Sequence, residues 1–404
     1  MRGLIGIIAA FLLYATGAAA ADPSAAGLAW SDLPPVPPPP GKDGQLGLGG
    51  PFVGTSGGAV LVAGGANFPD GPPWHGGKKV WCDSVYVLQE QAGGPPRWLT
   101  GLEMRLPRSL AYGASVQAAD GVVCIGGCDR EACYRDVFVL RWDSVTRKIE
   151  TEPLPPLPRP LAMMAAARAG DVIYVAGGQE TAKDPVVTKN FWSLNLLTRG
   201  RPADFRWREL EAWPGPARIA AVAAAQENGG EPRFYLFSGR NVAHAGVDLL
   251  TDAYEFNPKT GRWRRLADIA LPGEKPRCVM AAPAAAVDGR ILVFGGDDGG
   301  RFLQQERLER LAARRAALSL ASDQITRELA EWCDGHPGFS REIFAYSAST
   351  NTWTKAGELP ATSRLTTAAA LWRSAIVIPT GEVRPGVRTP EVWQATTYQG
   401  SAKP

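Results

Sequence analysis

An apolar strand pattern that ends in a glycine pair, or in a close variant of one, recurs six times along the chain. The six copies are LVAGG at 61–65, VCIGG at 123–127, YVAGG at 174–178, LFSGR at 236–240, LVFGG at 292–296 and VIPTG at 377–381. Each is followed by a second strand pattern with an aromatic residue at one register, namely Tyr86, Phe138, Trp192, Tyr254, Phe344 and Trp393. Evenly spaced strands separated by turn signals are typical of a β-propeller. The sequence therefore predicts an all-β fold of six blades.

Other repeated residues are expected to serve the architecture first. The paired glycines allow turns where a side chain would clash, and the aromatic residues fill the wedge between neighbouring sheets. Four units carry a later tryptophan, and the second unit has Ile149 in its place; the tryptophans are Trp98, Trp207, Trp263 and Trp353. An arginine precedes the innermost strand in five units, and we expect most of these to hold turns or channel walls: Arg108, Arg159, Arg218, Arg277 and Arg364.

The two ends of the chain are expected to meet in the sixth blade. That unit has only three strand patterns before the C-terminus, and the segment LAWSDLP at 28–34 has the pattern of the missing outer strand. A ring closed by an N-terminal strand leaves no free sheet edge. The proline-rich stretch 34–40 then connects this strand to the first blade, although a polyproline ligand for a partner protein remains an alternative.

The fifth unit is interrupted by an insertion at about 303–335. This segment is rich in Leu, Ala, Arg and Glu, and its apolar residues recur at helical intervals, as at Leu308, Leu311, Leu318, Ile325 and Leu329. It predicts a helical insertion in a blade loop. The insertion either decorates the rim of the propeller or caps the binding face, and the sequence leaves both possibilities open.

Residues 1–21 have the features of a secretory signal peptide. A short apolar run from Leu4 to Tyr14 is followed by small residues up to Ala21, and this run is too short to span a bilayer comfortably. An uncleaved anchor is the alternative. We expect the propeller to occupy residues 22–404, to be free of the membrane after cleavage, and to lie in the periplasm if the source is bacterial.

Charge and metal-binding residue types argue against several functions. The chain has 43 basic and 40 acidic residues and no basic blocks interleaved with aromatics, so nucleic acid is not an expected partner. Its three histidines are scattered and it has no Cys-x-x-Cys, which disfavours a metal site and a copper oxidase on this type of fold. Among six cysteines, Cys128 and Cys133 are the expected disulfide, and Cys124 is expected to be a buried thiol.

The loop GEVRPGVRTP at 381–390 carries the residues best suited to chemistry. It places Glu382 six residues before Arg388 on a segment stiffened by proline and glycine. A fixed carboxylate can accept and return a proton, and an arginine can hold an anion in two-point geometry. The loop therefore indicates proton transfer on an acidic substrate, although such loops are often purely structural.

Taken together, these motifs resemble a known family. The repeat resembles the kelch motif, and the segments GGANFP at 64–69, GGKK at 76–79 and GEVRPGVRT at 381–389, with the helical insertion, resemble the sialic acid mutarotases, or N-acetylneuraminate epimerases. The order of blades is similar to that of the cyclically permuted mutarotase family. Thr380 and Arg384 depart from residues that are frequent in that family, but neither departure removes the acid or the arginine.

The resemblance implies an isomerase that interconverts the α and β anomers of N-acetylneuraminate by opening and closing the sugar ring. It implies that Glu382 is the acid/base residue and Arg388 its companion, with no cofactor and a small acidic sugar as partner. Other residues of this face are candidates for substrate binding: Arg384, Asn67, Lys78, Arg240, His244, Asp297 and Arg301.

Two other functions remain open on the sequence. A kelch propeller can be a non-catalytic module that binds carbohydrate or protein, and the substrate could be a different acidic sugar. The sequence does not decide the oligomeric state.

Overall fold

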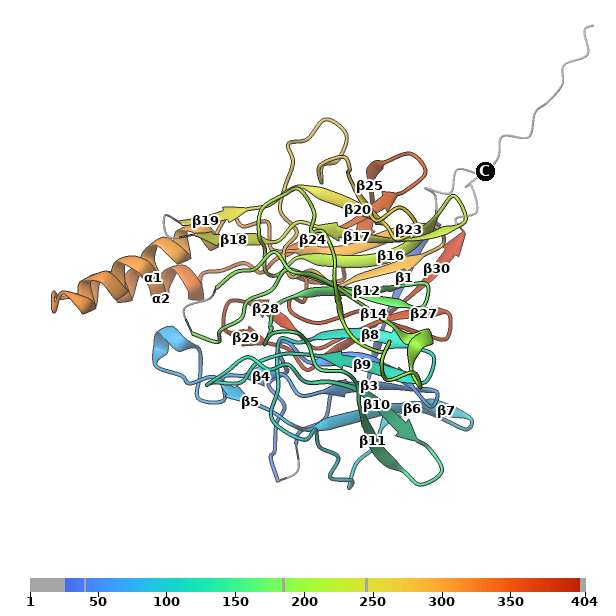
Figure 1. Cartoon of the computed structure of the whole chain (residues 1–404). Coiled ribbons are helices and arrows are strands. Elements are labelled where there is room, and N and C mark those ends of the chain that lie inside the picture. The colour runs from blue at the N-terminus through green and yellow to red at the C-terminus, as the bar shows by residue number, and fades with distance from the viewer. Residues whose placement is uncertain (1–25, 40, 184–185, 244–245, 400–404) are drawn as a thin grey trace, which may run out of the picture.

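The computed structural model describes residues 26–39, 41–183, 186–243 and 246–399. It is a ring of six four-stranded antiparallel sheets, shown in Figure 1. First strands of neighbouring blades contact one another around the axis, as β2 does with β8 and β26. The predicted six-bladed propeller is thus confirmed.

The blades follow one another in chain order, and the strands of each run from the axis of the ring to its outer edge. Blade one comprises β2 (Phe52–Ser56), β3 (Ala59–Ala63), β6 (Val85–Gln91) and β7 (Gly94–Trp98). Blade two comprises β8 (Ala114–Ala118), β9 (Gly121–Ile125), β10 (Val137–Asp143) and β11 (Lys148–Pro153). Blade three comprises β12 (Ala165–Ala169), β13 (Val172–Ala176), β14 (Phe191–Asn195) and β15 (Arg208–Glu209). Blade four comprises β16 (Val222–Asn228), β17 (Glu231–Phe237), β20 (Ala253–Asn257) and β21 (Arg262–Arg265). Blade five comprises β22 (Ala284–Val287), β23 (Arg290–Gly296), β24 (Ser340–Ser347) and β25 (Thr352–Glu358). Blade six comprises β26 (Ala370–Trp372), β27 (Ala375–Pro379), β30 (Val392–Gln399) and β1 (Ala26–Leu33).

The N-terminal strand closes the ring as expected. β1 pairs antiparallel with β30, so the sixth sheet has the order β1-β30-β27-β26. Trp30 of β1 packs edge-on against Trp393 of β30, with ring centroids 5.9 Å apart. Residues 34–39 then run on towards the first blade, held by hydrogen bonds such as Val36 N to Pro390 O at 2.8 Å.

The glycine pairs end the second strand of each blade with two residues at positive φ. In the first blade these are Gly64 (66°) and Gly65 (93°), and a Cβ on Gly64 would lie 2.4 Å from the carbonyl oxygen of Leu110. In the fourth and sixth blades Ser238 and Thr380 take the first place at 56° and 46°, and their hydroxyls bond backbone groups of adjacent loops. The fourth pair is therefore Ser238–Gly239, one residue earlier than the motif LFSGR indicates.

The aromatic residue of the third strand has the same partner position in all six blades, as predicted. The pairs are Tyr86↔Val62, Phe138↔Cys124, Trp192↔Val175, Tyr254↔Leu236, Phe344↔Val293 and Trp393↔Ile378.

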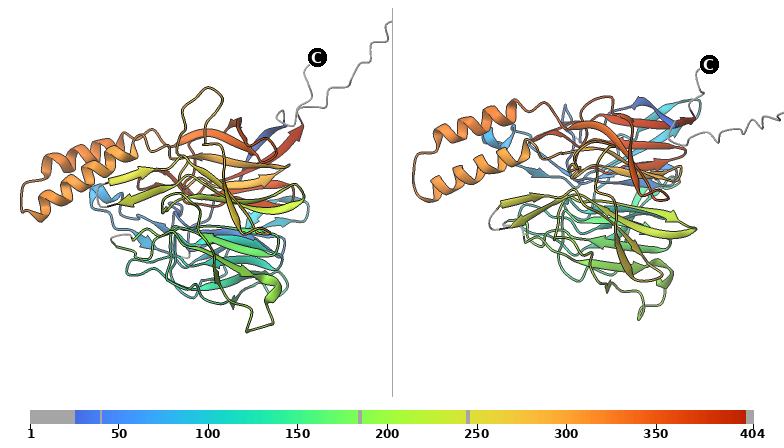
Figure 2. Two further views of the ribbon diagram at one scale, coloured as in Figure 1. Left: turned by 45° about the horizontal axis from the view of Figure 1, so that its top comes forward. Right: turned by 90° about the horizontal axis from the view of Figure 1, so that it is seen from above.

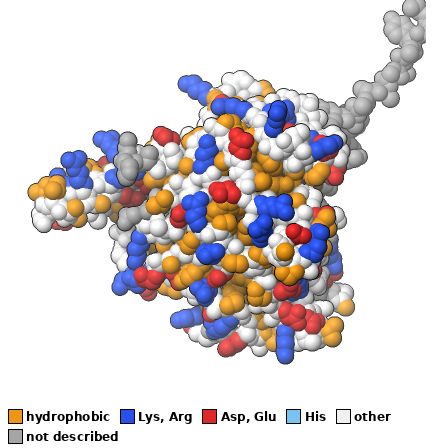
Figure 3. Space-filling model, in the orientation of Figure 1, with side chains coloured by type: hydrophobic (Ala, Val, Ile, Leu, Met, Phe, Trp, Pro, Cys, Tyr) orange, Lys and Arg blue, Asp and Glu red, His pale blue; other side chains and the backbone are white. Residues whose placement is uncertain are grey.

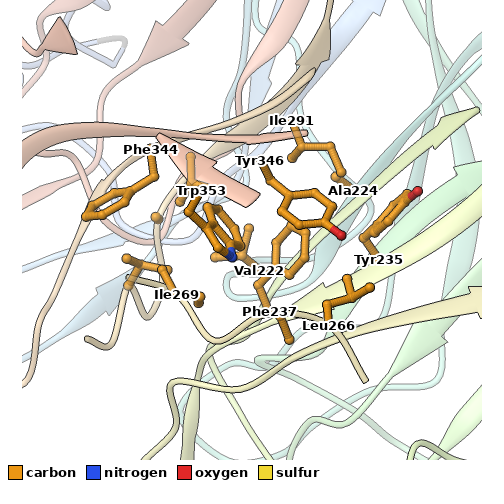
Figure 4. Close-up of a cluster of buried hydrophobic side chains, with 14 of the residues drawn as sticks. Val222, Ala224, Tyr235, Phe237, Leu266, Ile269, Ile291, Phe344, Tyr346 and Trp353 are labelled. Atoms are coloured by element: carbon orange, nitrogen blue, oxygen red, sulfur yellow. The ribbon is translucent and has the colours of Figure 1, made fainter. Parts of the chain in front are cut away.

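Aromatic side chains fill the space between neighbouring sheets. Figure 4 shows the cluster between blades four and five, where Phe237 lies edge-on to Trp353 with centroids 5.0 Å apart. Large apolar side chains of this kind contribute about 1.5–3 kcal/mol each when fully buried. Tryptophans in the outer strands, or directly before one as Trp207 is, also donate to backbone carbonyls of the connection that precedes their blade: Trp98 to Pro34, Trp207 to Pro155, Trp263 to Glu211 and Trp353 to Ala267.

The five repeated arginines are structural. Each binds a polar side chain just before the third strand, or within its start, in the same blade: Arg108 with Asp136, Arg159 with Asn190, Arg218 with Asp252, Arg277 with Glu342 and Arg364 with Glu391. Arg218 is fully buried and bonds Asp252 through both terminal nitrogens, at 2.9 and 2.8 Å.

The fifth blade carries the expected helical insertion. α1 (Phe302–Ala317) and α2 (Asp323–Asp334) lie between β23 and β24 and project from the ring as a hairpin, as Figures 1 and 2 show. Leu308 is buried, whereas Leu311 and Leu318 are exposed. Neither helix, nor any other within the described ranges, is long and apolar enough to cross a membrane.

Three small two-stranded sheets lie between the second and third strands of other blades. They are β4 (Ala66–Asn67) with β5 (Val80–Trp81), β18 (Arg240–Ala243) with β19 (Gly246–Leu249), and β28 (Glu382–Arg384) with β29 (Val387–Arg388). Figure 1 places them on the same side of the ring as the helical hairpin. Two 3₁₀ helices, Pro73–His75 and Leu196–Thr198, complete the secondary structure of the described residues.

The predicted disulfide is wrong. Cys128 and Cys133 face each other across an isolated antiparallel bridge, but both are free thiols, and so is the buried Cys124. A hydrogen bond between the two thiols lowers the pKa of Cys128 and raises that of Cys133. The pair is satisfied as two thiols, without a covalent bond.

Candidate active site

The residue that follows the glycine pair occupies an equivalent position in every blade. Each of these residues forms an isolated bridge with a residue that leads into the first strand of its own blade: Gly49↔Ala66, Ala111↔Cys128, Ala162↔Gln179, Ile219↔Arg240, Met280↔Asp297 and Leu365↔Glu382. We call Ala66, Cys128, Gln179, Arg240, Asp297 and Glu382 the rim positions. They form one ring at the end of the propeller that carries the helical hairpin.

All the rim positions except Ala66 line one cavity of about 470 Å³. This size falls within the usual range for small-molecule sites. The cavity shares Tyr112, Met163, Ala281 and Thr366 with the alanine-lined channel that follows the propeller axis. It is therefore the mouth of the central funnel.

Glu382 and Arg388 are direct neighbours in this cavity. They are paired residues of the β28–β29 hairpin, so their separation in sequence brings them face to face. Arg388 Nη2 lies 3.4 Å from Glu382 Oε1, and the same oxygen accepts a 2.8 Å hydrogen bond from Gly386 N. The Arg388 side chain is 3% exposed and that of Glu382 is 17% exposed, so the carboxylate is more accessible than the guanidinium.

Arg388 has hydrogen-bonding capacity that the described residues leave unused. Its Nε and Nη1 are buried without a hydrogen-bond partner among them, and its guanidinium lies 4.6 Å from the ring centre of Phe68. Burial lowers the pKa of Arg388, but Glu382 and Tyr112 outweigh burial and raise it overall. The guanidinium is thus charged, and the N–H groups on its Nε and Nη1 are free for an anion, for which arginine is well suited.

Arg240 and Asp297 line the cavity from the two preceding blades. Burial lowers the pKa of Arg240, against nearby carboxylates that include Glu306 and Asp297. Burial, with Asp298 and Glu382 nearby, raises the pKa of Asp297 to about 6, and Gly299 N donates to its Oδ1 at 2.8 Å.

Lys79, and not Lys78, lies on the cavity wall. Its Nζ is 4.9 Å from the ring centre of Tyr112 and 5.7 Å from that of Trp81, whereas Lys78 is exposed. Lys79 lies one residue before β5 and shares the face of Trp81, because side chains alternate along an extended segment.

Three further predicted binding residues do not line the cavity. Asn67 Nδ2 donates to Gly47 O at 3.4 Å, Arg301 Nη2 donates to Trp332 O at 2.7 Å, and Arg384 Nη1 donates to Asp334 O at 3.3 Å. His244 lies outside the described residues.

Aromatic residues of the cavity were missed by sequence reasoning, chiefly Phe68, Trp74 and Tyr112. Trp74 is fixed by a 2.8 Å hydrogen bond from its Nε1 to Asp334 Oδ1 at the end of α2. It also packs on Gly386, where an added Cβ would lie 2.9 Å from its ring. A loop of the first blade thus covers the turn of the Glu382–Arg388 hairpin.

Within the described part of the chain, no group of three or more His, Cys, Asp or Glu residues is placed to hold a metal ion. On the face seen in Figure 3, basic and acidic side chains are interspersed and form no continuous basic field.

Comparison with known proteins identifies the family. A family model described as "NANM: N-acetylneuraminate epimerase" matches residues 13–149 and 154–403. The chain belongs to the N-acetylneuraminate epimerase family. The resemblance noted in the sequence is thereby confirmed, while the shifted order of blades stays a prediction.

Individual members of the N-acetylneuraminate epimerase family match only part of this chain. The N-acetylneuraminate epimerase of Haemophilus influenzae (strain PittEE) is 27% identical over 249 residues, which cover 59% of this chain and 58% of that protein. That of Pasteurella multocida (strain Pm70) is 28% identical over 241 residues, covering 58% and 57%. The match thus spans less than two thirds of each relative's length.

A solved structure described as "Structure of YjhT" is similar with a TM-score of 0.59 and 15% identity, over 91% of this chain and 99% of that one. At this identity the similarity supports the fold alone.

Proposed function

We propose that this protein is a mutarotase that interconverts the α and β anomers of N-acetylneuraminate. Membership of the N-acetylneuraminate epimerase family supports the reaction type. The observation that carries the proposal is the buried Arg388, whose free N–H donors lie beside Glu382 in a cavity of suitable size. A buried cation with unused donors is costly unless a ligand satisfies it, and a carboxylate is an acceptor that arginine binds well.

The proposed reaction needs only proton transfer. Arg388 binds the carboxylate of the sugar and orients the anomeric carbon towards Glu382. Glu382 accepts the proton of the anomeric hydroxyl, the bond between the anomeric carbon and the ring oxygen breaks, and Glu382 passes this proton to the ring oxygen. On closure Glu382 takes the proton back as that oxygen attacks the other face of the carbonyl, and returns it to the new anomeric oxygen, which gives the second anomer.

Anomer-resolved NMR of freshly released α-N-acetylneuraminate tests this function. We expect the wild-type protein to equilibrate the anomers faster than buffer, and Glu382→Gln to lower kcat by roughly 10²- to 10⁴-fold, because general acid–base catalysis contributes about this much. Arg388→Lys should mainly raise KM, by roughly ten- to a hundredfold, since lysine cannot make the two-point contact. Equilibration by wild type at the buffer rate would exclude the proposal.

Matched controls come from exposed residues outside the cavity. Glu358→Gln on β25 and Arg310→Lys on α1 change the same groups at side chains that are 51% and 42% exposed. Both should retain wild-type kinetics. A loss of activity in these controls would show that charge removal acts through the fold and not through the site.

Two alternatives are settled by the same measurement. A mutarotase of another acidic sugar would leave N-acetylneuraminate unchanged but equilibrate that sugar, and would still need Glu382. A non-catalytic sugar-binding module would bind the sugar with no turnover, and its affinity would fall in Arg388→Lys but not depend on Glu382 as an acid.

We also propose that the protein is exported, with residues 1–21 removed, and acts in the periplasm. The apolar run and the small residues after it support this. Mass spectrometry of protein from the periplasmic fraction of a bacterial host should find a chain that begins near residue 22. Recovery of the full chain from the cytoplasm would contradict it.

A further inference from the structure

Asp297 stands in the fifth blade where Glu382 stands in the sixth. Both follow the glycine pair, both form the equivalent bridge, with Met280 and Leu365 respectively, and both line the 470 Å³ cavity. Since blades five and six are neighbours in the ring, Asp297 and Glu382 occupy neighbouring rim positions.

The rim is divided by charge. Arg240, Asp297 and Glu382 occupy three consecutive blades, whereas the other three rim positions, Ala66, Cys128 and Gln179, have no formal charge when the thiol is protonated. The charged rim positions are thus gathered on one half of the funnel mouth, next to Arg388, while Lys79, Asp129 and Arg130 line the cavity from the first two blades.

Asp297 is buried but has no ion-pair partner within 4 Å among the described residues. Its backbone is fixed on both sides by Met280, at 3.2 and 3.1 Å, and its Oδ1 accepts one hydrogen bond, from Gly299 N. The other buried acids of the described residues are paired, Asp252 with Arg218 and Glu255 with Arg233 and Arg264. A buried carboxyl without a cationic partner is expected to be protonated in part near neutral pH, because burial disfavours the charged form.

We propose that Asp297 is a second catalytic carboxyl group, which protonates the ring oxygen of the sugar while Glu382 removes the proton of the anomeric hydroxyl. This inference rests on the proposed mutarotase function. It replaces a single acid that works in two successive steps with two acids that act together.

The proton and electron balance is closed. In ring opening, the O–H bond of the anomeric hydroxyl breaks and its proton passes to Glu382, while the electron pair left on oxygen forms the carbonyl. The bond from the anomeric carbon to the ring oxygen breaks, and its electron pair takes the proton of Asp297. The two carboxyls carry one negative charge before and after, and ring closure reverses both transfers.

The groups around Asp297 suit this role. Its raised pKa, about 6, keeps a proton available where an ordinary aspartate would have none. Arg240 from β18 and Glu382 from β28 act on it with opposite signs, together with Asp298 beside it. Arg240 would stabilise the carboxylate formed when Asp297 gives up its proton. Pairs of acids whose surroundings separate their pKa values are a recognised arrangement for this chemistry.

The pH dependence of mutarotation by Asp297→Asn tests the proposal. Wild type should lose kcat/KM on the alkaline side as Asp297 becomes ionised. We expect Asp297→Asn to lower kcat by roughly 10²-fold or more with little change in KM, and to remove this alkaline decline. Asp297→Glu, which keeps a carboxyl group, should restore part of the activity and the decline. Thermal melting checks that each variant is folded.

Asp298→Asn is the matched control, because Asp298 is the exposed neighbour in sequence. It should keep wild-type kcat, with the alkaline decline moved to slightly lower pH, since one negative charge near Asp297 is gone. Wild-type kcat in Asp297→Asn, or an effect on KM alone, would overturn the second catalytic role while leaving the proposed function intact. A wild-type protein without mutarotase activity would overturn both.

Discussion

Asp297 also has a consequence for stability at the scale of the single residue. An aspartate with the ordinary pKa of 3.8 ionises well before Asp297, whose pKa is about 6 in the fold. Between these values the unfolded chain binds fewer protons than the folded protein, so the free energy of unfolding falls as pH rises. The difference of about two pKa units corresponds to a loss on the order of 3 kcal/mol that is complete above pH 6.

Asp297→Asn should therefore be more stable than wild type at pH 7.5, with the difference vanishing towards pH 4. Urea unfolding at the two pH values measures this directly. A difference of the same size at both pH values would mean that the effect arises from packing and not from ionisation. The result would not depend on any assumption about the substrate.

The position of a candidate site residue was predictable from the sequence where the repeat places it in the fold. It was less predictable where contacts between distant segments decide which way the side chain points. Glu382 and Arg388 follow from their spacing on a short hairpin. Arg301 was a candidate because it follows a glycine pair, but its guanidinium lies over Trp332 at 3.9 Å, a contact made only when α2 folds back. Lys78 was expected at the site, whereas Lys79 lies on the cavity wall on the same face as Trp81, and Lys78 is exposed.

At the scale of the element, Asp334 joins three separate segments over the cavity. Its carboxylate accepts from Trp74 Nε1 and bonds His75 Nε2, each at 2.8 Å, and its carbonyl accepts from Arg384 on the β28–β29 hairpin. The hydrogen bonds to Trp74 and His75 lower the pKa of Asp334, so the contact is present at neutral pH. The helical insertion therefore touches the binding face, as one of its two expected roles requires.

Asp334→Ala should release the loop 68–79 and raise KM about three- to tenfold with a smaller change in kcat, because Trp74 would no longer be held over the hairpin. Hydrogen exchange should increase in residues 68–79 and stay unchanged in the blades. Asp323→Ala at the start of α2 is the control. Unchanged exchange in this loop would falsify the role given to Asp334.

Element boundaries were predictable from strand patterns and glycine pairs, except where another residue imitates glycine. Ser238 adopts positive φ because its hydroxyl bonds the carbonyl of Leu250 and the N–H of Val279. Because Ser238 takes the place of the first glycine, the motif LFSGR at 236–240 lies one residue later than the equivalent segments of the other blades. The Cys128–Cys133 pairing was correct in space, since the two residues oppose each other, but sequence spacing does not reveal whether the thiols are joined.

At the scale of the whole molecule, stability should depend on β1, which completes the sixth sheet. Deletion of residues 26–33 would expose the edge of β30 and remove Trp30 from Phe294 and Trp393. We expect a fall in melting temperature well beyond that of a single core substitution, together with aggregation through the open edge. Thermal melting and light scattering measure both effects.

Deletion of residues 400–404, beyond β30, is the control and should leave both measurements unchanged. Restoring β1 as a separate peptide should recover part of the lost stability, because the sheet offers it a complete row of backbone partners. No recovery with excess peptide would indicate that β1 contributes mainly through chain connectivity.

The equivalence of the rim positions makes the chemistry of this protein separable from its scaffold. Each side chain there is supplied by a different blade through the same backbone bridge, so one can be exchanged with little demand on the other five. Ala66 leaves a sixth place vacant. Proteins built on this plan can change the ligand they accept by substitution at single rim positions, without any change in the backbone of a loop.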